Sequence, residues 1–255
     1  MRLLGLARDL KRRKARERRG LFVAEGVRAV EELLASPLRL HGALVAADAG
    51  PDPRLAALLG GLSARGIGVE QVSAAEFRSA ADTDAPQGVL AIAAVPERAL
   101  EALSLPPGGP VVLLLDGLQD PGNVGTIVRT AAALDAAAVL ALPGTVDLWN
   151  AKVVRSAMGA LFDYPALPCT WDAVDAFRLR QPLALWGADA RGHALDRRAP
   201  RHTAPLGVVV GNEGSGLSAE ARRRVDRLVA LPIAGRVESL NAAVAAGILL
   251  YELTR

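Results

Sequence analysis

The chain has 255 residues, 51% of them apolar, with 30 basic and 27 acidic residues and a net charge of +3. This length allows one large domain or two smaller ones, and the apolar fraction excludes a disordered or fibrous protein. No uncharged apolar run reaches the roughly 18 residues of a transmembrane helix, and we expect no signal peptide and no membrane association. Cys169 is the only cysteine, so no internal disulfide can form, and we expect a cytoplasmic protein.

The positive charge is concentrated near the start of the chain. Residues 8–19 hold eight basic and two acidic residues, so the rest of the chain has 22 basic and 25 acidic residues and a net charge of −3. The eight cations are Arg8, Lys11, Arg12, Arg13, Lys14, Arg16, Arg18 and Arg19. Such a block beside a mildly acidic body favours an arm that binds phosphates. A solvated helix face or a disordered tail has the same composition and stays open.

The first 95 residues alternate strand and helix patterns. Helix 27–35 is predicted because its apolar residues recur at the spacing of one helix face. The predicted strands are 21–24, 40–46, 69–72 and 89–95, and the other predicted helix is 53–65. This pattern predicts a small α/β domain over residues 1–95, without a cluster of His, Cys or carboxylates that suggests chemistry.

A run of prolines and glycines at 106–110 predicts a linker over residues 96–110 and a second domain over residues 111–255. Its predicted strands are 111–115, 138–142, 183–188, 207–210 and 228–231, and its predicted helices are 124–134, 148–161, 171–180, 219–225 and 240–254. Unbroken apolar runs such as 111–115 are typical of a parallel sheet buried on both faces. Ligands of such sheets lie beyond the carboxyl ends of the strands, so the segments after the strands should hold the site.

The first such segment follows strand 111–115 and enters helix 124–134. Asn123 is placed to cap that helix, and Arg129 lies six residues later. Gly125 allows close approach of a backbone or a ligand. A plain helix cap and an exposed helix arginine are the alternative interpretations of these two side chains.

The second segment is a glycine-rich turn after strand 207–210. Gly211, Gly214 and Gly216 expose backbone amides and carbonyls to a ligand. The pattern matches neither the dinucleotide fingerprint nor a Walker loop, so it favours a pocket lined by backbone over a phosphate cradle. Ser218 is predicted to cap the next helix, with Glu220 in its first turn.

The third segment follows strand 228–231 and enters a long alanine-rich helix. Ser239 is predicted to cap this helix, which places Asn241 on its first turn. Asparagine is a poor helix former at such a position, which favours a functional role for Asn241.

In this order the three segments resemble motifs 1, 2 and 3 of the SpoU (TrmH-like) family, within the SPOUT class of RNA methyltransferases. The matching residues are Asn123, Gly125, Arg129, Gly211, Asn212, Glu213, Gly214, Gly216, Pro232, Ser239, Leu240 and Asn241. Segment 155–160 resembles a further family segment. Segments 22–26 and 86–90 resemble the family's substrate-binding domain, which is similar to small ribosomal RNA-binding proteins.

The resemblance implies an α/β methyltransferase domain with a parallel sheet and a deep trefoil knot, a feature otherwise essentially absent from proteins. It implies S-adenosylmethionine as cofactor and a homodimer with the active site at the subunit interface. The implied cofactor-binding residues are Gly211, Leu231, Leu240, Asn212, Gly214 and Ile233. The implied catalytic residues are Arg129, Asn123, Glu213, Ser239 and Asn241.

The implied reaction is in-line transfer of a methyl group to a ribose 2′-hydroxyl of structured RNA. It needs positioning of the reactants and help in deprotonating the hydroxyl, but no metal. His41, His193 and His202 show no ligand spacing. Because arginine stays protonated, we expect Arg129 to grip a phosphate and stabilise the developing alkoxide rather than act as the base. Asn123, Ser239 and Asn241 are neutral side chains that would orient the ribose and the arginine, and Glu213 would balance cationic centres or fix the loops.

Three alternatives bear on this interpretation. The resemblance of the domain over residues 1–95 to small ribosomal RNA-binding proteins favours ribosomal RNA, of the 23S type, over tRNA as substrate. A non-catalytic RNA-binding protein on a methyltransferase scaffold would share the fold, although it would have no reason to keep all five implied catalytic residues. A dinucleotide-dependent oxidoreductase is disfavoured by the missing glycine fingerprint.

Arg222, Arg223, Arg224 and Arg227 form a second basic group, for which a solvated helix face is the simpler interpretation.

Overall fold

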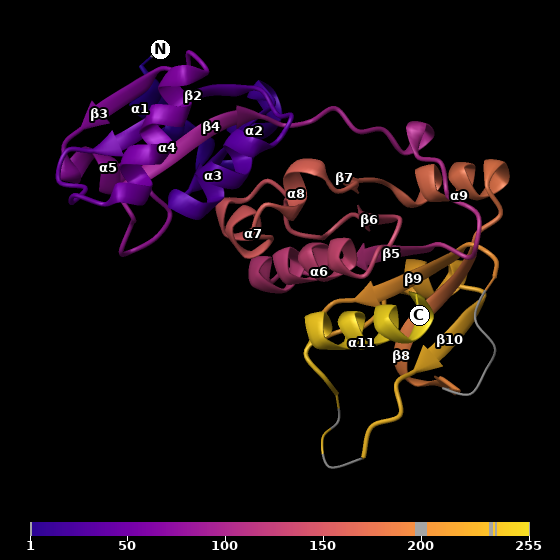
Figure 1. Ribbon diagram of the computed structural model, residues 1–255. Helices are drawn as coiled ribbons and strands as arrows, with labels where there is room; N and C mark the ends of the chain where they lie inside the picture. Colours follow the sequence, from indigo (N-terminus) through magenta and orange to yellow (C-terminus); the bar gives the residue numbers. More distant parts are fainter. Residues whose placement is uncertain (1, 197–202, 235–236, 238, 255) are drawn as a thin grey trace. The chain divides into compact units, whose positions relative to one another are not determined.

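The computed structural model describes residues 2–196, 203–234, 237 and 239–254. The chain forms two compact units, which Figure 1 shows coloured along the sequence. Unit 1 consists of Met1–Glu97 and Trp149–Asp163, and unit 2 of Arg98–Leu148 and Tyr164–Arg255. In the described part of the chain, no helix has the length and apolar character needed to cross a membrane.

Unit 1 contains a four-stranded sheet in the order β1-β4-β2-β3, in which β4 is antiparallel to both neighbours and β3 is parallel to β2. Its first elements are α1 (Leu3–Leu10), α2 (Arg13–Arg19), β1 (Leu21–Glu25), α3 (Val27–Ala35) and β2 (Leu40–Ala46). They are followed by α4 (Pro53–Ala64), β3 (Val69–Val72), α5 (Ala74–Ala80) and β4 (Val89–Ala94). The small α/β unit predicted from the sequence is present.

The basic segment is helical and is part of the fold of unit 1. Helix α1 buries Ala7 and Leu10 in a cluster with Phe77 and Leu90. Helix α2 ends at Gly20, which takes the left-handed backbone conformation (φ +61°) common at helix ends. Of the interpretations left open by the charge pattern, a disordered tail is therefore removed.

Residues 149–163, which the sequence places in the second domain, pack on unit 1. Trp149 lies against the fully buried Phe22, with ring centroids 4.5 Å apart, and Phe162 lies 5.8 Å from the same ring. The single helix predicted over 148–161 is wrong, because the segment forms two short helices, α7 (Ala151–Ser156) and α8 (Ala160–Asp163). The break occurs at Met158 and Gly159, both of which have positive φ. A Cβ on Gly159 would lie 2.9 Å from that of Glu32, so only glycine allows this close approach.

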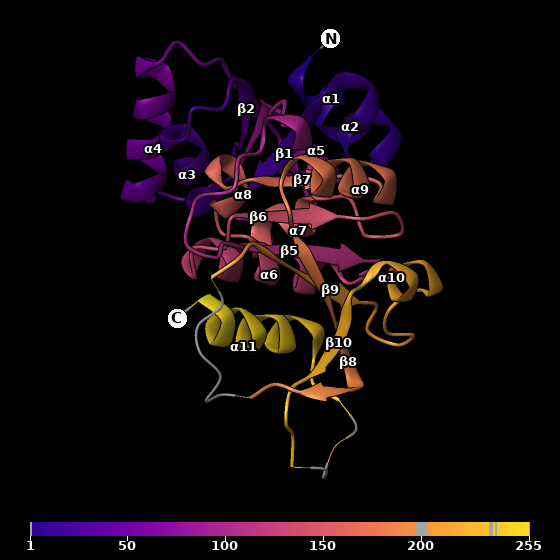
Figure 2. The ribbon, with the colours of Figure 1, turned by 90° about the vertical axis from the view of Figure 1, so that its right-hand side faces the viewer.

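Unit 2 contains a six-stranded, fully parallel sheet in the order β10-β8-β9-β5-β6-β7, which Figure 2 shows from the side. After a short 3₁₀ helix, η1 (Leu100–Ala102), come β5 (Val111–Asp116), α6 (Pro121–Ala133), β6 (Ala138–Ala141) and β7 (Ala166–Pro168). Then follow α9 (Trp171–Arg180), β8 (Ala184–Ala194), β9 (Leu206–Gly211), α10 (Ala219–Arg224), β10 (Arg227–Ala230) and α11 (Ala242–Thr254). The predicted parallel sheet is confirmed, and β8 is longer than the predicted strand 183–188.

Strand β5 lies in the centre of this sheet and is buried along its whole length, as expected for a strand covered on both faces. Helices α6 and α11 lie side by side (Figures 1 and 2), and α11 also contacts β5 and β9. Although α11 follows β10, which forms the sheet edge, it returns to the sheet centre. This return brings the third sequence segment beside the first two.

Candidate functional site

The carboxyl end of β5 is fixed by two buried polar side chains that the sequence did not single out. The Asp116 carboxylate accepts a hydrogen bond from the backbone N–H of Ser218 at 2.7 Å. The Thr145 hydroxyl donates to the carbonyl of Leu115 at 2.7 Å and accepts from the N–H of Gly117 at 3.1 Å. Both side chains are buried, and buried polar groups that are fully paired hold a loop in one arrangement.

Helix α6 begins earlier than predicted, and Asn123 is not its cap. The Asp120 side chain accepts from the N–H of Asn123 at 2.8 Å, and Pro121 occupies the first helical position. The prediction of Asn123 as a helix cap is therefore wrong, because an acidic residue before a proline suits that position better. As a result, the Asn123 side chain is available to other partners.

Asn123 connects the three sequence segments through a hydrogen-bond network with Glu213 and Asn241. Its Nδ2 donates to Glu213 Oε1 at 3.1 Å, and its Oδ1 accepts from Asn241 Nδ2 at 3.0 Å. Each side chain comes from a different segment, so the network holds the start of α6, the glycine-rich turn and the start of α11 together.

Glu213 accepts from the beginning of α6 as well as from Asn123. Its carboxylate faces the backbone N–H groups of Gln119 and Asp120, each at 3.4 Å. Partial desolvation opposes ionisation of Glu213, but hydrogen bonds from Asn123 and from backbone N–H groups outweigh it and hold its pKa below the usual value. The ionised carboxylate therefore fixes the glycine-rich turn to the start of α6.

The glycine-rich turn is held by Asn212. Its Oδ1 accepts from the N–H groups of Gly214 and Ser215, both at 3.0 Å, and its Nδ2 donates to the carbonyl of Gly117 at 2.9 Å. A Cβ on Gly211 would lie 2.3 Å from the carbonyl carbon of Gly216, so no larger residue fits there. The predicted cap Ser218 is confirmed, since its hydroxyl accepts from the N–H of Ala221.

Asn241, rather than Ser239, caps α11. The Asn241 Oδ1 accepts from the N–H groups of Ala243 at 2.9 Å and Val244 at 3.3 Å. The prediction of Ser239 as the cap is therefore wrong by two positions, and the Asn241 amide both begins the helix and contacts Asn123. Residues 235, 236 and 238 of this third segment lie outside the described residues.

A cavity of about 600 Å³ lies between the second and third segments. Its lining includes all six residues predicted to contact a cofactor, namely Gly211, Asn212, Gly214, Leu231, Ile233 and Leu240. Glu213, Ser239 and Asn241 line it as well. Residues that the sequence assigned to two separate motifs therefore line one cavity.

One wall of the cavity carries two charges, of which Asp189 was missed in the sequence analysis and Arg222 was assigned only to a basic group on a helix face. Asp189 on β8 pairs with Arg222 on α10 and accepts from the N–H of Arg191 at 2.8 Å. Desolvation opposes ionisation of Asp189, but its backbone and Arg222 hydrogen bonds prevail and lower its pKa. Asp189 lies beyond the predicted end of its strand, so only the length of β8 could have identified it.

Arg129 does not line this cavity. It lies exposed on α6 and makes no ion pair or hydrogen bond with any residue that the structure describes. It follows Asn123 by six residues, about one and two-thirds helical turns, so the two side chains leave different faces of α6. Unit 2 therefore forms the cavity and the hydrogen-bond network, but its own Arg129 lies outside both.

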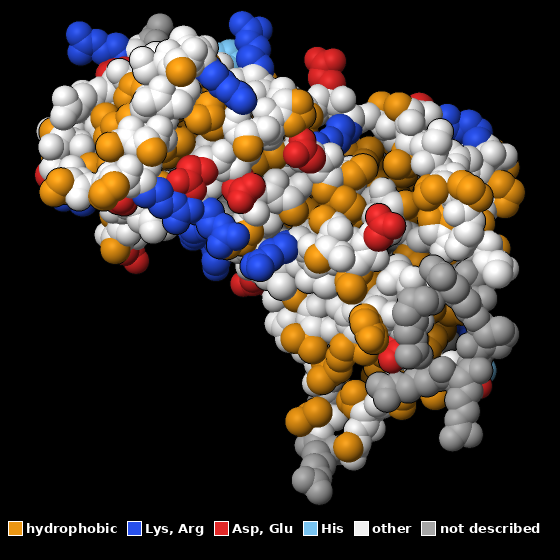
Figure 3. Space-filling model, viewed as in Figure 1, with side chains coloured by type: hydrophobic (Ala, Val, Ile, Leu, Met, Phe, Trp, Pro, Cys, Tyr) orange, Lys and Arg blue, Asp and Glu red, His pale blue; other side chains and the backbone are white. Residues whose placement is uncertain are grey.

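Exposed hydrophobic side chains gather around α11 (Figure 3). Val244 and Tyr251 on α11 are 51% and 57% exposed, and Val237 and Ile233 before it are 57% and 37% exposed. Large exposed apolar side chains that gather on one part of a surface are typical of a contact surface.

The cations of residues 8–19 differ in their surroundings. Arg16 is buried, and its Nη1 donates to the carbonyls of Leu10 and Lys11 at the end of α1. The other seven side chains are exposed or partly exposed. No group of His, Cys, Asp and Glu among the described residues could hold a metal ion, and His202 lies outside them.

Residues 110–251 match the family model of the SpoU rRNA methylases, and residues 6–91 match that of the MRM3-like substrate binding domain. The 23S rRNA (guanosine(2553)-2′-O)-methyltransferase RlmP of Bacillus subtilis is 35% identical over 254 residues, covering 96% of this chain and 93% of the relative. The 23S rRNA (guanosine-2′-O-)-methyltransferase RlmB of Haemophilus influenzae is 34% identical over 237 residues, covering 90% of this chain and 96% of the relative.

Solved structures of methyltransferases also match nearly the whole chain. The crystal structure of the SpoU methyltransferase AviRb from Streptomyces viridochromogenes in complex with AdoMet superposes with a TM-score of 0.85 at 29% identity, covering all of this chain and 97% of that one. The AdoMet-bound rRNA methyltransferase from Sinorhizobium meliloti gives a TM-score of 0.83 at 28% identity, covering 98% and 93%. Because the family match spans more than half of the chain and its relatives span nearly all of it, the chain belongs to the SpoU rRNA methylase family.

Proposed function

We propose that this chain transfers the methyl group of S-adenosylmethionine to a ribose 2′-hydroxyl of ribosomal RNA, most directly of the 23S type on which its relatives act. The observation that carries the proposal is the cavity, whose lining unites the residues of the second and third segments beside the Asn123–Glu213–Asn241 network. The family membership leaves no support for a dinucleotide-dependent oxidoreductase.

The cavity suits the chemistry of the cofactor. Its volume of about 600 Å³ is within the usual range for ligand pockets. The apolar side chains of Leu231, Ile233 and Leu249 would contact a flat adenine ring, and the backbone of the glycine-rich turn would offer donors and acceptors to its edge. Asp189 and Arg222 provide opposite charges for the ammonium and carboxylate of the amino-acid end. When bound, S-adenosylmethionine supplies a methyl group on a sulfonium, which is an excellent leaving group.

The residues of this chain then have three tasks. Asn123, Ser239 and Asn241 are neutral hydrogen-bonding side chains suited to orient the ribose, which is the positioning that the transfer needs. The ionised Glu213 balances positive charge and holds the loops. Arg129 binds a phosphate of the target nucleotide and stabilises the developing alkoxide, while a phosphate oxygen relays the proton to water, because a guanidinium cannot serve as a base near neutral pH.

The separation of Arg129 from the cavity supports a homodimer in which each site is completed across the subunit interface. Exposed Val244, Tyr251 and Val237 supply apolar surface for that contact. Helix α11 returns from the sheet edge to its centre, and this return supports the trefoil knot expected in the methyltransferase domain. Arg129 would then act on the ribose held by the partner subunit.

Unit 1 would bind the RNA, with residues 8–19 contacting phosphates and a fold similar to that of small ribosomal RNA-binding proteins. Its match to a substrate binding domain supports this assignment. The eight cations concentrate the positive charge of the chain in one place, and phosphate contacts supply most of the affinity of such interfaces. In this proposal unit 1 binds the RNA and unit 2 transfers the methyl group to it.

Two measurements test the proposal. Calorimetry should show binding of S-adenosylmethionine to the purified protein, and mapping of 2′-O-methyl nucleotides should show one rRNA position that is lost when the protein is absent from its cells. Cofactor binding without a lost position in rRNA or tRNA would favour the alternative, a non-catalytic RNA-binding protein on this scaffold. Absence of cofactor binding would overturn the methyltransferase function.

A further inference from the structure

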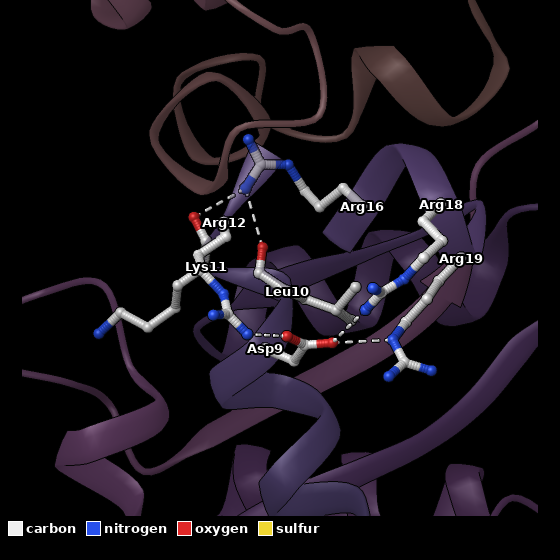
Figure 4. Close-up of polar contacts among 7 residues, drawn as sticks. All are labelled: Asp9, Leu10, Lys11, Arg12, Arg16, Arg18 and Arg19. Carbon is white, nitrogen blue, oxygen red and sulfur yellow. Dashed lines mark hydrogen bonds and ion pairs between the residues drawn. The ribbon is translucent and has the colours of Figure 1, made fainter. Parts of the chain in front are cut away.

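One carboxylate organises the basic helices of unit 1. Asp9, at the end of α1, makes ion pairs with Arg12, Arg18 and Arg19, as Figure 4 shows. Arg19 Nε lies 2.9 Å and Arg18 Nη2 3.4 Å from Asp9 Oδ2, while Arg12 pairs with Oδ1. A single acidic side chain thus gathers arginines from the turn and from the last turn of α2.

Hydrogen bonds within unit 1 hold the cluster of Asp9, Arg12, Arg18 and Arg19 in place. Buried Arg16 donates to the carbonyls of Leu10 at 2.8 Å and Lys11 at 3.0 Å, which joins α2 to the end of α1. Lys11 Nζ donates to the carbonyl of Ala81 at 2.7 Å, which ties the turn to the rest of unit 1. The position of Asp9 is therefore set by the fold and not by the arginines around it.

Exposure divides the cluster into an inner and an outer part. The Asp9 side chain is only 12% exposed, whereas those of Arg12 and Arg18 are 76% and 69% exposed. A guanidinium carries five N–H donors in a fixed fork, so one contact with a carboxylate leaves donors for a phosphate. The ion pairs hold the pKa of Asp9 below its usual value, with the Arg19 hydrogen bond as the largest cause and that of Arg12 next.

We infer that Asp9 is a positioning residue for RNA binding, because it holds Arg12 and Arg18 in place to receive phosphates. This inference rests on the proposed binding of RNA by residues 8–19. Exposed arginines that are already ordered lose less conformational entropy on binding, which raises affinity. The three arginines and Asp9 together keep a net positive charge, so the carboxylate orders the cluster without cancelling its attraction for phosphate.

The inference makes a prediction opposite in sign to that of simple charge counting. If Asp9 acted only as a negative charge, Asp9→Asn would strengthen RNA binding, because it raises the net charge of the segment. If Asp9 positions arginines, Asp9→Asn weakens binding although the charge rises. Glu17→Gln is the matched control in the same segment, because Glu17 is itself 58% exposed and, among the residues that the structure describes, pairs only with Arg13, at 2.7 Å. A single exposed pair of this kind orders its partner little, whereas Asp9 is 12% exposed and pairs with three arginines.

The experiment measures filter binding of in vitro transcribed 23S rRNA to the full-length protein over a series of KCl concentrations. We expect Asp9→Asn to weaken binding by about threefold or more, and Glu17→Gln to leave it unchanged or slightly tighter. Equal tightening by both variants would overturn the inference. Thermal unfolding of each variant establishes that unit 1 is intact.

A merely structural role for Asp9 is tested by a double-mutant cycle. In an Arg12→Gln/Arg18→Gln background, a positioning Asp9 has no outer arginines to present, so adding Asp9→Asn should no longer weaken binding. A purely structural role predicts the same loss in both backgrounds, because Arg19 still pairs with Asp9, and that result would reject the inference. If the Arg12→Gln/Arg18→Gln variant itself binds RNA as tightly as the parent, the proposed role of this segment fails, whatever the effect of Asp9.

Discussion

The Asn241 side chain donates from Nδ2 to Asn123 Oδ1 at 3.0 Å, across 118 positions of sequence, while its own Oδ1 caps α11. One amide thus starts a helix with its oxygen and joins another segment with its nitrogen. The two tasks use different atoms, so substitutions can separate them.

Asn241→Asp should keep the cap and lose the contact with Asn123. A carboxylate accepts from helix N–H groups as well as an amide oxygen does, and negative charge is favourable there. It cannot donate to Asn123, so we expect nearly unchanged stability and strongly reduced methyl transfer. Asn241→Ala should lose both, with a cap cost of about 1 kcal/mol. Urea unfolding and a methyl-transfer assay on both variants check this, and equal stability losses would contradict it.

Glu213→Gln should destabilise the protein most above the pH at which the glutamate ionises. The folded-state pKa of Glu213 lies below its usual value of 4.5. Its stabilising contribution is therefore fully present above about pH 5 and is lost as the pH falls through the folded-state pKa. Thermal unfolding of parent and variant between pH 3 and 8 should show a difference that shrinks toward low pH. A difference that stays constant would show that ionised Glu213 does not hold the loops.

Arg129 substitutions should change catalysis without changing stability or cofactor binding. The side chain is exposed and contacts no described residue by ion pair or hydrogen bond, and such surface changes usually fall within about 0.5 kcal/mol. If the guanidinium grips a phosphate in bidentate fashion, Arg129→Lys should be nearly inactive, whereas a charge-only role predicts partial activity. Single-turnover methyl transfer distinguishes the two, and full activity of Arg129→Ala would reject both.

Gly211→Ala should disrupt the cavity, and Gly214→Ala should not. The added Cβ at Gly211 would lie 2.3 Å from backbone of Gly216, whereas at Gly214 its nearest contact is the Asn212 Oδ1 at 3.7 Å. Forcing a methyl group into such a contact costs about 1–3 kcal/mol. We expect weaker S-adenosylmethionine binding by calorimetry for Gly211→Ala alone. Equal binding by both variants would show that the turn adapts.

Among the basic residues of the first helices, substitution of Arg16 should lower stability, and substitution of Lys14 should change only RNA binding. Arg16→Met removes two hydrogen bonds from a buried guanidinium and should cost about 2 kcal/mol of stability. Lys14→Gln changes an exposed side chain and should leave stability unchanged, while lowering the slope of log affinity against log salt by up to about 0.9. Urea unfolding and rRNA binding over a KCl series check both. Truncation of residues 1–19 would remove the buried Ala7 and Leu10 and expose the core that they cover, including Phe77 and Leu90, so substitutions are the cleaner test.

The sequence predicted the parallel sheet of unit 2 because buried strands such as β5 leave an unbroken apolar run. It predicted the wrong caps because Asp120 and Asn123, or Ser239 and Asn241, are equally suitable residues a few positions apart. The choice between them depends on the backbone path into each helix. The packing of residues 149–163 on unit 1 depends on rings such as Trp149 and Phe22, which no local pattern links.

The residues of the candidate site could be selected from the sequence, but their arrangement could not. The link from Asn123 to Glu213 depends on Asp120 taking the cap, which frees the amide. The charged wall formed by Asp189 and Arg222 has no local signature, since both residues resemble ordinary surface charges. Charge alone left undecided whether residues 8–19 formed a helix face or a tail. The signal for α1 was the helical spacing of Leu3, Leu6, Ala7 and Leu10, most of which lie before the charged segment.

The network of Asn123, Glu213 and Asn241 also bears on the order in which the chain folds. Its contacts join residues 90 and 118 positions apart, whereas Asp9 and Arg19 are ten positions apart. Contacts between distant positions form late, because the entropy of closing a long loop must be overcome first. The longest link that holds the arginine cluster, from Lys11 to Ala81, spans 70 positions within unit 1, fewer than the 118 positions that the docking of α11 must close. We expect a folding intermediate of this protein to bind RNA before it can methylate it.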